Sequence, residues 1–309
     1  MNADIFVIEI VWGLAALVLL LAGFSYLSQR RIASRKGLQQ NGLESVLLLK
    51  QLITLTQQHR GISFGIKNGD TSLCSQLTSV QSQINDAKYQ LIANTRLLFS
   101  MERWSHCASH WDKLQKNWQE LSANDALLQH NCLIRNQLYL LEDVAAAHQL
   151  SDEALPHQPN VALLWKDLLQ IGECIGQARA MGTGIAAAKT CSGVAKIRMM
   201  FLVERIKNTA DISMPQICGL LGNSSETSLA DINLRLKSFL SSVEENLLGA
   251  EIPSISAQDY FLSATQMLDE ILKLFDSAVL ELKKTILDPT GSDNSFSGSG
   301  FVPEVPGSV

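Results

Sequence analysis

The sequence has 309 residues, of which 46% are hydrophobic and only 6% aromatic, and its formal net charge is −5. A chain with net negative charge lacks the basic field that nucleic-acid binding requires, so we expect no nucleic-acid partner. None of the seven prolines precedes Pro156, and such a long stretch rich in Leu, Ala, Gln and Ser predicts helix. Since no segment alternates apolar and polar residues with a period of two, the sequence predicts an all-α fold.

The N-terminal part contains an apolar stretch, residues 5–27, that is interrupted only by Glu9. At about 1.5 Å of rise per residue, a helix of this length can cross a bilayer. Asp4 precedes the stretch, and four basic residues follow it: Arg30, Arg31, Arg35 and Lys36. Because basic residues stay on the cytoplasmic side, we expect a single-pass inner-membrane protein whose helical domain is cytoplasmic. Residues 1–36 are therefore predicted to form a transmembrane anchor with a basic flank.

The next part, residues 40–155, is predicted to form a first helical bundle. Helices are expected at residues 42–66, 70–101, 104–121 and 126–148. The tryptophans of the third helix, Trp104, Trp111 and Trp118, are seven residues apart. This heptad spacing favours a packed core over a ligand box. The sequence LPHQP at residues 155–159 ends this part, and we expect the boundary between two halves there.

Residues 156–287 are predicted to form a second helical bundle, which makes the two bundles a pseudo-repeat. Helices are expected at residues 160–189, 192–210, 226–248 and 256–287, with a break at 215–225. Ser256 and Asp259 resemble a capping box at the start of the last helix. Residues 288–309 are rich in Gly, Ser and Pro, a composition that predicts a disordered tail.

A short segment occurs twice in the chain. Residues 58–66 (QHRGISFGI) and residues 177–185 (QARAMGTGI) are related by a constant offset, since 177 minus 58 is 119. Each copy has one arginine, Arg60 or Arg179, beside a row of glycine and alanine residues spaced by four. A glycine inside a helix costs about 1 kcal/mol relative to alanine, and close packing of helices accounts for such rows. It does not account for the arginines.

The two arginines need a negative partner if they are buried. A guanidinium cannot lose its proton in a protein, so a buried one requires a carboxylate or another anion. No acidic residue lies three or four positions from Arg60 or Arg179 along the chain. Two interpretations stay open at this point. Either each arginine forms an ion pair across helices, with Glu204 or Asp86 as candidates, or the two arginines bind an anion from solution.

The first copy of the segment also suggests a family. QHRGIS at residues 58–63 resembles the Gln-x-Arg-Gly-x-Ser motif of the nitrate- and nitrite-sensing (NIT) domain of bacterial signalling proteins, and LVERI at residues 202–206 resembles its second, Glu-Arg motif. The resemblance covers approximately residues 45–287. It implies two stacked helical bundles that bind nitrate or nitrite through arginines between helices. It points to Arg60 and Arg179 as the principal ligand-binding residues, and to Arg205 and Arg198 as further ones.

The chemistry of the anion fits this interpretation. Nitrate is planar and singly charged, and a guanidinium is planar with paired N–H donors. We expect Gln58, Gln177 and Ser63 or Thr183 to add neutral donors. Without the anion the arginines repel each other, and with it the helices draw together, so that binding would signal by helix repacking. Family members carry output modules such as kinases or RNA-binding antiterminator domains, and since we recognise none here, an unidentified signalling partner is expected.

Other interpretations remain. The main alternative is a membrane-anchored helical scaffold that holds protein partners without sensing, in which acidic side chains neutralise both arginines. A third is a receptor for another small anion or an organic acid. His106 and His110 lie at metal-ligand spacing but are more typical of a surface. We expect no enzyme, no cofactor and no metal, and a homodimer is plausible because single-span sensors often work by relative helix motion.

Overall fold

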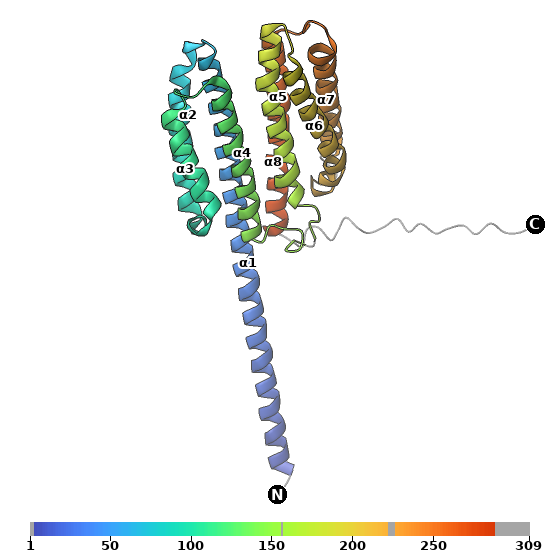
Figure 1. Ribbon diagram of the computed structural model, residues 1–309. Helices are drawn as coiled ribbons and strands as arrows, with labels where there is room; N and C mark the ends of the chain where they lie inside the picture. Colours follow the sequence, from blue (N-terminus) through green and yellow to red (C-terminus); the bar gives the residue numbers. More distant parts are fainter. Residues whose placement is uncertain (1–2, 156, 222–225, 288–309) are drawn as a thin grey trace, which may run out of the picture.

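Two groups of helices lie side by side, and one long helix extends away from them (Figure 1). The computed structural model describes the backbone of residues 3–155, 157–221 and 226–287, and the side chains of these residues except 3–11, 13–16 and 226–228. No β-strand occurs in these ranges, which confirms the all-α prediction. The predicted disordered tail at residues 288–309 lies outside the described residues.

The first helix group contains four α-helices: α1 (Ala3–Lys67), α2 (Cys74–Asn94), α3 (Glu102–Asn117) and α4 (Ala123–Ala147). Two short 3-10 helices connect them, η1 (Thr71–Leu73) and η2 (Arg96–Ser100). The heptad seam predicted in α3 is buried in the core, including Trp104, Trp111 and Trp118. Those tryptophans are therefore core residues, as the spacing predicted.

The second helix group contains α5 (Leu169–Ala188), α6 (Gly193–Leu221), α7 (Glu226–Val243) and α8 (Ala257–Leu287). Two π-helical turns accompany them, η3 (Leu164–Leu168) before α5 and η5 (Glu244–Gly249) after α7. At the start of α8, the backbone N–H of Asp259 donates to Ser256 Oγ at 3.0 Å, which confirms the predicted cap. Helix α5 packs on α6 and α8, so that it lies inside the group.

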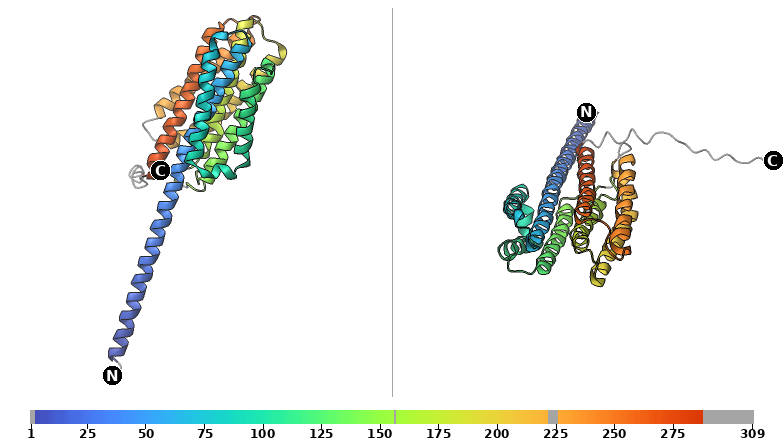
Figure 2. Two further views of the ribbon diagram at one scale, coloured as in Figure 1. Left: turned by 90° about the vertical axis from the view of Figure 1, so that its left-hand side faces the viewer. Right: turned by 90° about the horizontal axis from the view of Figure 1, so that it is seen from above.

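The two groups meet through their inner helices. Seen from above, α1, α4, α5 and α8 occupy the middle of the molecule, with α2 and α3 on one outer side and α6 and α7 on the other (Figure 2). Ion pairs join α1 to α8, between Lys50 and Asp276 at 2.9 Å and between Glu44 and Lys283 at 3.8 Å. Two of these inner helices, α1 and α5, carry the two copies of the duplicated segment.

Several predicted helix boundaries are wrong. The helix expected at residues 42–66 is the end of the much longer α1, and the helix expected at residues 70–101 is divided into η1, α2 and η2. The break expected at residues 215–225 is also misplaced, because α6 continues through Pro215 to Leu221. A proline inside a helix costs about 3 kcal/mol. Burial of Met214 and Ile217 on either side of it offsets that cost.

Among the helix residues whose side chains the structure describes, no stretch is both long enough and apolar enough to cross a membrane. The predicted anchor at residues 5–27 is thus given no support. Much of that stretch, residues 5–11 and 13–16, lies outside the described side chains.

Candidate anion-binding site

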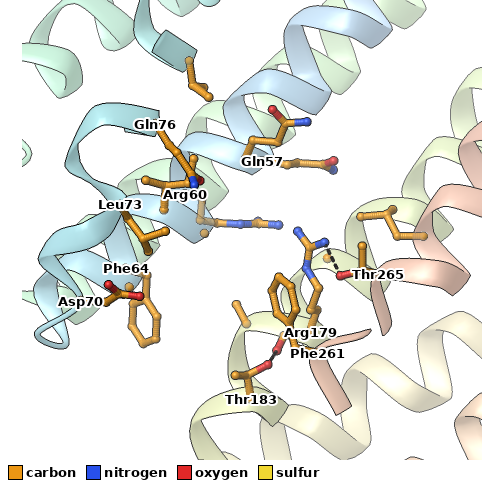
Figure 3. A pocket seen from close by; sticks show the side chains of 18 of the residues that line it. Gln57, Arg60, Phe64, Asp70, Leu73, Gln76, Arg179, Thr183, Phe261 and Thr265 are labelled. Carbon is orange, nitrogen blue, oxygen red and sulfur yellow. Dashed lines mark hydrogen bonds between the residues drawn. The ribbon is translucent and has the colours of Figure 1, made fainter. Parts of the chain in front are cut away.

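A cavity of about 1380 Å³ lies between the two helix groups. Its walls include both copies of the duplicated segment, one on α1 and the other on α5, together with residues of α2 and α8. Figure 3 shows the side chains of Arg60 and Arg179 entering this space from opposite walls, with their guanidinium groups pointing toward each other. The fold therefore places the two arginines of the repeat on one cavity.

The glycines of the repeat only partly fit the close packing that the sequence suggested. A Cβ atom at Gly61 or Gly184 would meet nothing within 4 Å, because both residues face the cavity. A Cβ atom at Gly65 would lie 2.7 Å from Leu73 Cδ1, and one at Gly176 would lie 2.9 Å from Arg60 Nη2. Some glycines thus make room for a neighbouring side chain, whereas others leave a space open between α1 and α5.

Arg60 lies on the buried face of α1 and is only 1% exposed. Its Nη1 atom donates to Glu173 Oε1 at 2.5 Å and to Asn131 Oδ1 at 2.7 Å, and its Nη2 atom donates to Glu173 Oε2 at 3.3 Å. The expected candidates for its partner, Glu204 and Asp86, are wrong, since both are exposed. The positive charge of Arg60 is therefore already compensated by a carboxylate of the second helix group.

Glu173 is the site residue that sequence reasoning missed. It is 1% exposed and accepts two further hydrogen bonds, from Gln57 Nε2 and Gln177 Nε2, each at 2.8 Å. A sequence signal for it exists, because Glu173 is the one acidic residue between Asp167 and Glu204. An isolated carboxylate in an apolar helix needs donors around it. The structure supplies four donor contacts, from both helix groups.

Arg179 is held differently. Its Nη1 atom donates to Thr265 Oγ1 at 3.0 Å, and its Cζ atom lies 5.2 Å from the centre of the Phe261 ring. Among the described residues no carboxylate lies within ion-pair distance of it. Burial, and next the positive charge of Arg60, lower the pKa of Arg179, while the negative charges of Asp269 and Glu173 act in the opposite direction. Arg179 is thus a largely buried cation on the wall of a cavity, and no ion-pair partner for it occurs in the described part of the chain.

The predicted neutral donors are mostly engaged with the protein. Ser63 Oγ donates to the carbonyl of Arg60 at 3.1 Å, and Thr183 Oγ1 donates to the carbonyl of Arg179 at 2.7 Å. Gln177 donates to Glu173. Gln58 is exposed on the cavity wall, where it is the one predicted neutral donor with no hydrogen bond among those described for the chain. The roles of these residues in ligand binding stay predictions.

Arg198 and Arg205 do not lie with the other two arginines. Both are exposed on α6, and neither lines the cavity. The reason is the orientation of α6, whose buried face contains Leu202 and Ile206. Arg198 and Arg205, which are seven residues apart, lie together on the exposed edge of that face. The structure therefore separates them from the candidate site.

Comparisons with known proteins give one likeness in fold. No protein-family model and no curated protein matches the sequence. The solved structure of the NasR transcription antiterminator matches with a TM-score of 0.58 and 16% sequence identity, over 89% of this chain and 76% of that chain. At this identity the match concerns the fold alone. The chain shares the helical architecture of NasR over most of its length.

Proposed function

We propose that this protein is a sensor that binds nitrate or nitrite between Arg60 and Arg179. The observation that carries the proposal is the state of Arg179, a largely buried cation without an ion-pair partner among the described residues, facing Arg60 across a cavity. The scaffold alternative expects a carboxylate on each arginine. Arg60 meets that expectation through Glu173, but Arg179 does not.

The likeness to NasR supports the same proposal. NasR is a transcription antiterminator. Antitermination is one of the outputs expected for the NIT family, which the motif at residues 58–63 resembles. Two independent properties, a sequence motif and a fold, thus point to the same class of signalling protein.

The donors of the site suit a planar oxyanion. Among the described hydrogen bonds of Arg60, one N–H of Nη2 and the Nε–H have no acceptor. Arg179 uses a single N–H, toward Thr265. An anion between the guanidinium groups would therefore accept hydrogen bonds from both arginines. It would also reduce their mutual repulsion, which is one cause of the lowered pKa of Arg179.

Helix α1 provides a route for a signal. One continuous helix contains both the first duplicated segment and the part that projects beyond the helix groups (Figure 1). Gly61 and Gly184 leave open space on facing walls of the cavity, so the walls can approach each other without a clash at these positions. We infer that the anion draws α1 and α5 together and that α1 conveys the shift to a partner protein.

Attachment to the inner membrane is part of the same proposal. The N-terminal part of α1 carries exposed apolar side chains, including Leu19, Leu20 and Phe24. Burial of such side chains in a bilayer is favourable. From the basic residues that follow, we expect the helix groups to lie on the cytoplasmic side.

The binding proposal is tested by calorimetry with nitrate and nitrite on the purified chain. We expect measurable binding of at least one of these anions, and its loss in Arg179→Ala. The matched control is Arg198→Ala, because Arg198 is exposed and lies outside the cavity. The proposal is rejected if neither anion binds, or if Arg179→Ala binds as well as the control.

A larger organic anion is the second candidate, and the size of the cavity favours it. The volume of about 1380 Å³ exceeds the about 300–1,000 Å³ typical of pockets for small organic ligands. Apolar residues such as Phe64, Leu73 and Phe261 form part of the wall. Competition of nitrate against acetate and benzoate separates the candidates. Tighter binding of benzoate than of nitrate would favour the organic ligand.

A further inference from the structure

We propose that Glu173 restricts this site to singly charged anions. The inference rests on the anion-binding role proposed above, and it concerns the charge of the ligand that the site accepts. Its basis is the number and sign of the buried charges around the space between Arg60 and Arg179.

The hydrogen bonds of Glu173 are those that a carboxylate accepts. All four of its hydrogen-bond contacts come from N–H groups: two from Arg60, one from Gln57 and one from Gln177. Each oxygen of the Glu173 side chain accepts two of these hydrogen bonds. Both lone pairs of each oxygen are therefore used, and neither oxygen has a position left for a proton. The carboxylate is also fixed in place, because its donors come from both α1 and α5.

Two positive guanidinium groups and one negative carboxylate leave one net positive charge where Arg60 and Arg179 face each other. A singly charged anion between Arg60 and Arg179 would make this cluster neutral. A doubly charged anion would leave one uncompensated negative charge beside Glu173, which is costly in a buried position. Asp70 and Asp269, two further charged residues of the wall, are negative and exposed, so they add to the same preference.

The arrangement also explains why a buried carboxylate belongs in an anion site. Without Glu173, two facing arginines would carry two positive charges and would favour sulfate or doubly charged phosphate. With Glu173, the site keeps the planar donors of both arginines but only one net charge. Glu173 thus disfavours doubly charged anions through its own negative charge, and not by adding contacts to the preferred anion.

The first test uses the wild-type chain with nitrate, sulfate and inorganic phosphate as competing ligands. We expect sulfate to bind at least roughly tenfold more weakly than nitrate. Phosphate changes from singly to doubly charged around neutral pH, so its affinity should fall as the pH rises through that range, while nitrate measured at the same pH values serves as the control. Sulfate binding as tight as that of nitrate would overturn the proposal.

The second test uses Glu173→Gln, which keeps the shape of the side chain and removes its charge. We expect the ratio of sulfate to nitrate affinity to rise at least roughly tenfold. An unchanged ratio in a folded variant, verified by circular dichroism, would overturn the inference but not the binding function. A wild-type chain that binds none of the anions overturns both. Should Glu173→Gln fail to fold, the pH dependence of phosphate binding in the wild type decides.

Discussion

Arg60 of the first helix group and Glu173 of the second form a buried ion pair, with 2.5 Å between Arg60 Nη1 and Glu173 Oε1 and both side chains 2% exposed. The pair joins α1 to α5, the two helices that carry the duplicated segment. Its two charges are shielded from water, so the pair behaves differently from the ion pairs on the surface of the molecule.

The first prediction concerns the stability of this pair. Arg60→Met leaves Glu173 buried without its cation, which should lower the free energy of unfolding by about 3–5 kcal/mol. Replacing both residues by Met should recover much of that loss, because no unpaired charge then remains. Urea denaturation of the single and double variants measures both effects.

The control for this prediction is Lys207→Met. Lys207 pairs with Glu244 at 2.7 Å, but both side chains are substantially exposed, at 37% and 46%. Such a pair contributes about 0–1 kcal/mol. If Arg60→Met costs no more than Lys207→Met, the buried pair does not stabilise the contact between the helix groups.

The second prediction concerns the glycines on the cavity wall. Gly61→Ala and Gly184→Ala should each raise the free energy of unfolding by about 0.5–1 kcal/mol, since alanine favours helix and meets no neighbour there. Gly182→Ala should instead destabilise the chain, because its Cβ atom would lie 2.3 Å from the ring of Tyr260. Thermal unfolding of the three variants provides the comparison. Destabilisation by Gly61→Ala would show that this position is packed after all.

Local patterns in the sequence predicted much of the fold. The heptad of α3 and the cap at Ser256 depend on residues within one or two turns of a helix, and both are confirmed. The convergence of Arg60 and Arg179 was expected from the repeat, and the structure places both on one cavity. A repeat can indicate a contact between residues that are far apart in the sequence, because two similar segments tend to occupy equivalent positions in two similar halves of a fold.

The partner of Arg60 could not be predicted in the same way. Arg60 and Glu173 are 113 residues apart, and the spacing rules for helices concern only residues three or four positions apart. The continuation of α6 through Pro215 could not be predicted from local sequence either. Burial of this part of α6 in the second helix group outweighs the tendency of proline to end a helix. Both errors arise where tertiary contacts decide the outcome.

The third prediction concerns pH and a buried histidine pair beside the site. His59 Nδ1 and His130 Nε2 are 2.7 Å apart, and His130 Nδ1 lies 2.6 Å from the carbonyl oxygen of Ala126. A carbonyl only accepts, so His130 donates from Nδ1 and accepts from His59 through Nε2. His59 Nε2 lies 3.1 Å from Gln81 Nε2, which donates to it, so neither ring carries a second proton. Burial is the main cause that lowers the pKa of His59 to about 4 and that of His130 to about 3.

The sign of the effect follows from proton binding. In the unfolded chain both histidines bind protons below about pH 6.5, whereas in the folded chain they stay neutral. The free energy of unfolding is therefore highest above that pH, and it should fall as the pH drops from 7 to 5. The slope contributed by each histidine approaches about 1.4 kcal/mol per pH unit. Urea denaturation at several pH values in this range measures it.

Two variants distinguish the pair from other titrating groups. His130→Gln should reduce the slope of unfolding free energy against pH by the contribution of one histidine. His106→Gln, at an exposed position, should leave this slope unchanged. Equal stability at pH 7 and pH 5 in the wild type would contradict the assignment of two neutral histidines.

The fourth prediction concerns the projecting part of α1. The proposed membrane attachment predicts that Leu19→Glu combined with Leu20→Glu shifts the protein from the membrane fraction to the soluble fraction of a cell lysate, because each charge opposes insertion by about 2.5–3.5 kcal/mol at the centre of a span. The folded helix groups should be unaffected, since the side chains of both leucines are exposed. Val194→Glu combined with Ile197→Glu, at exposed positions on α6, is the matched control and should leave the distribution unchanged. If the α1 variant and the control distribute in the same way between the two fractions, the proposed attachment through the apolar side chains of α1 is wrong.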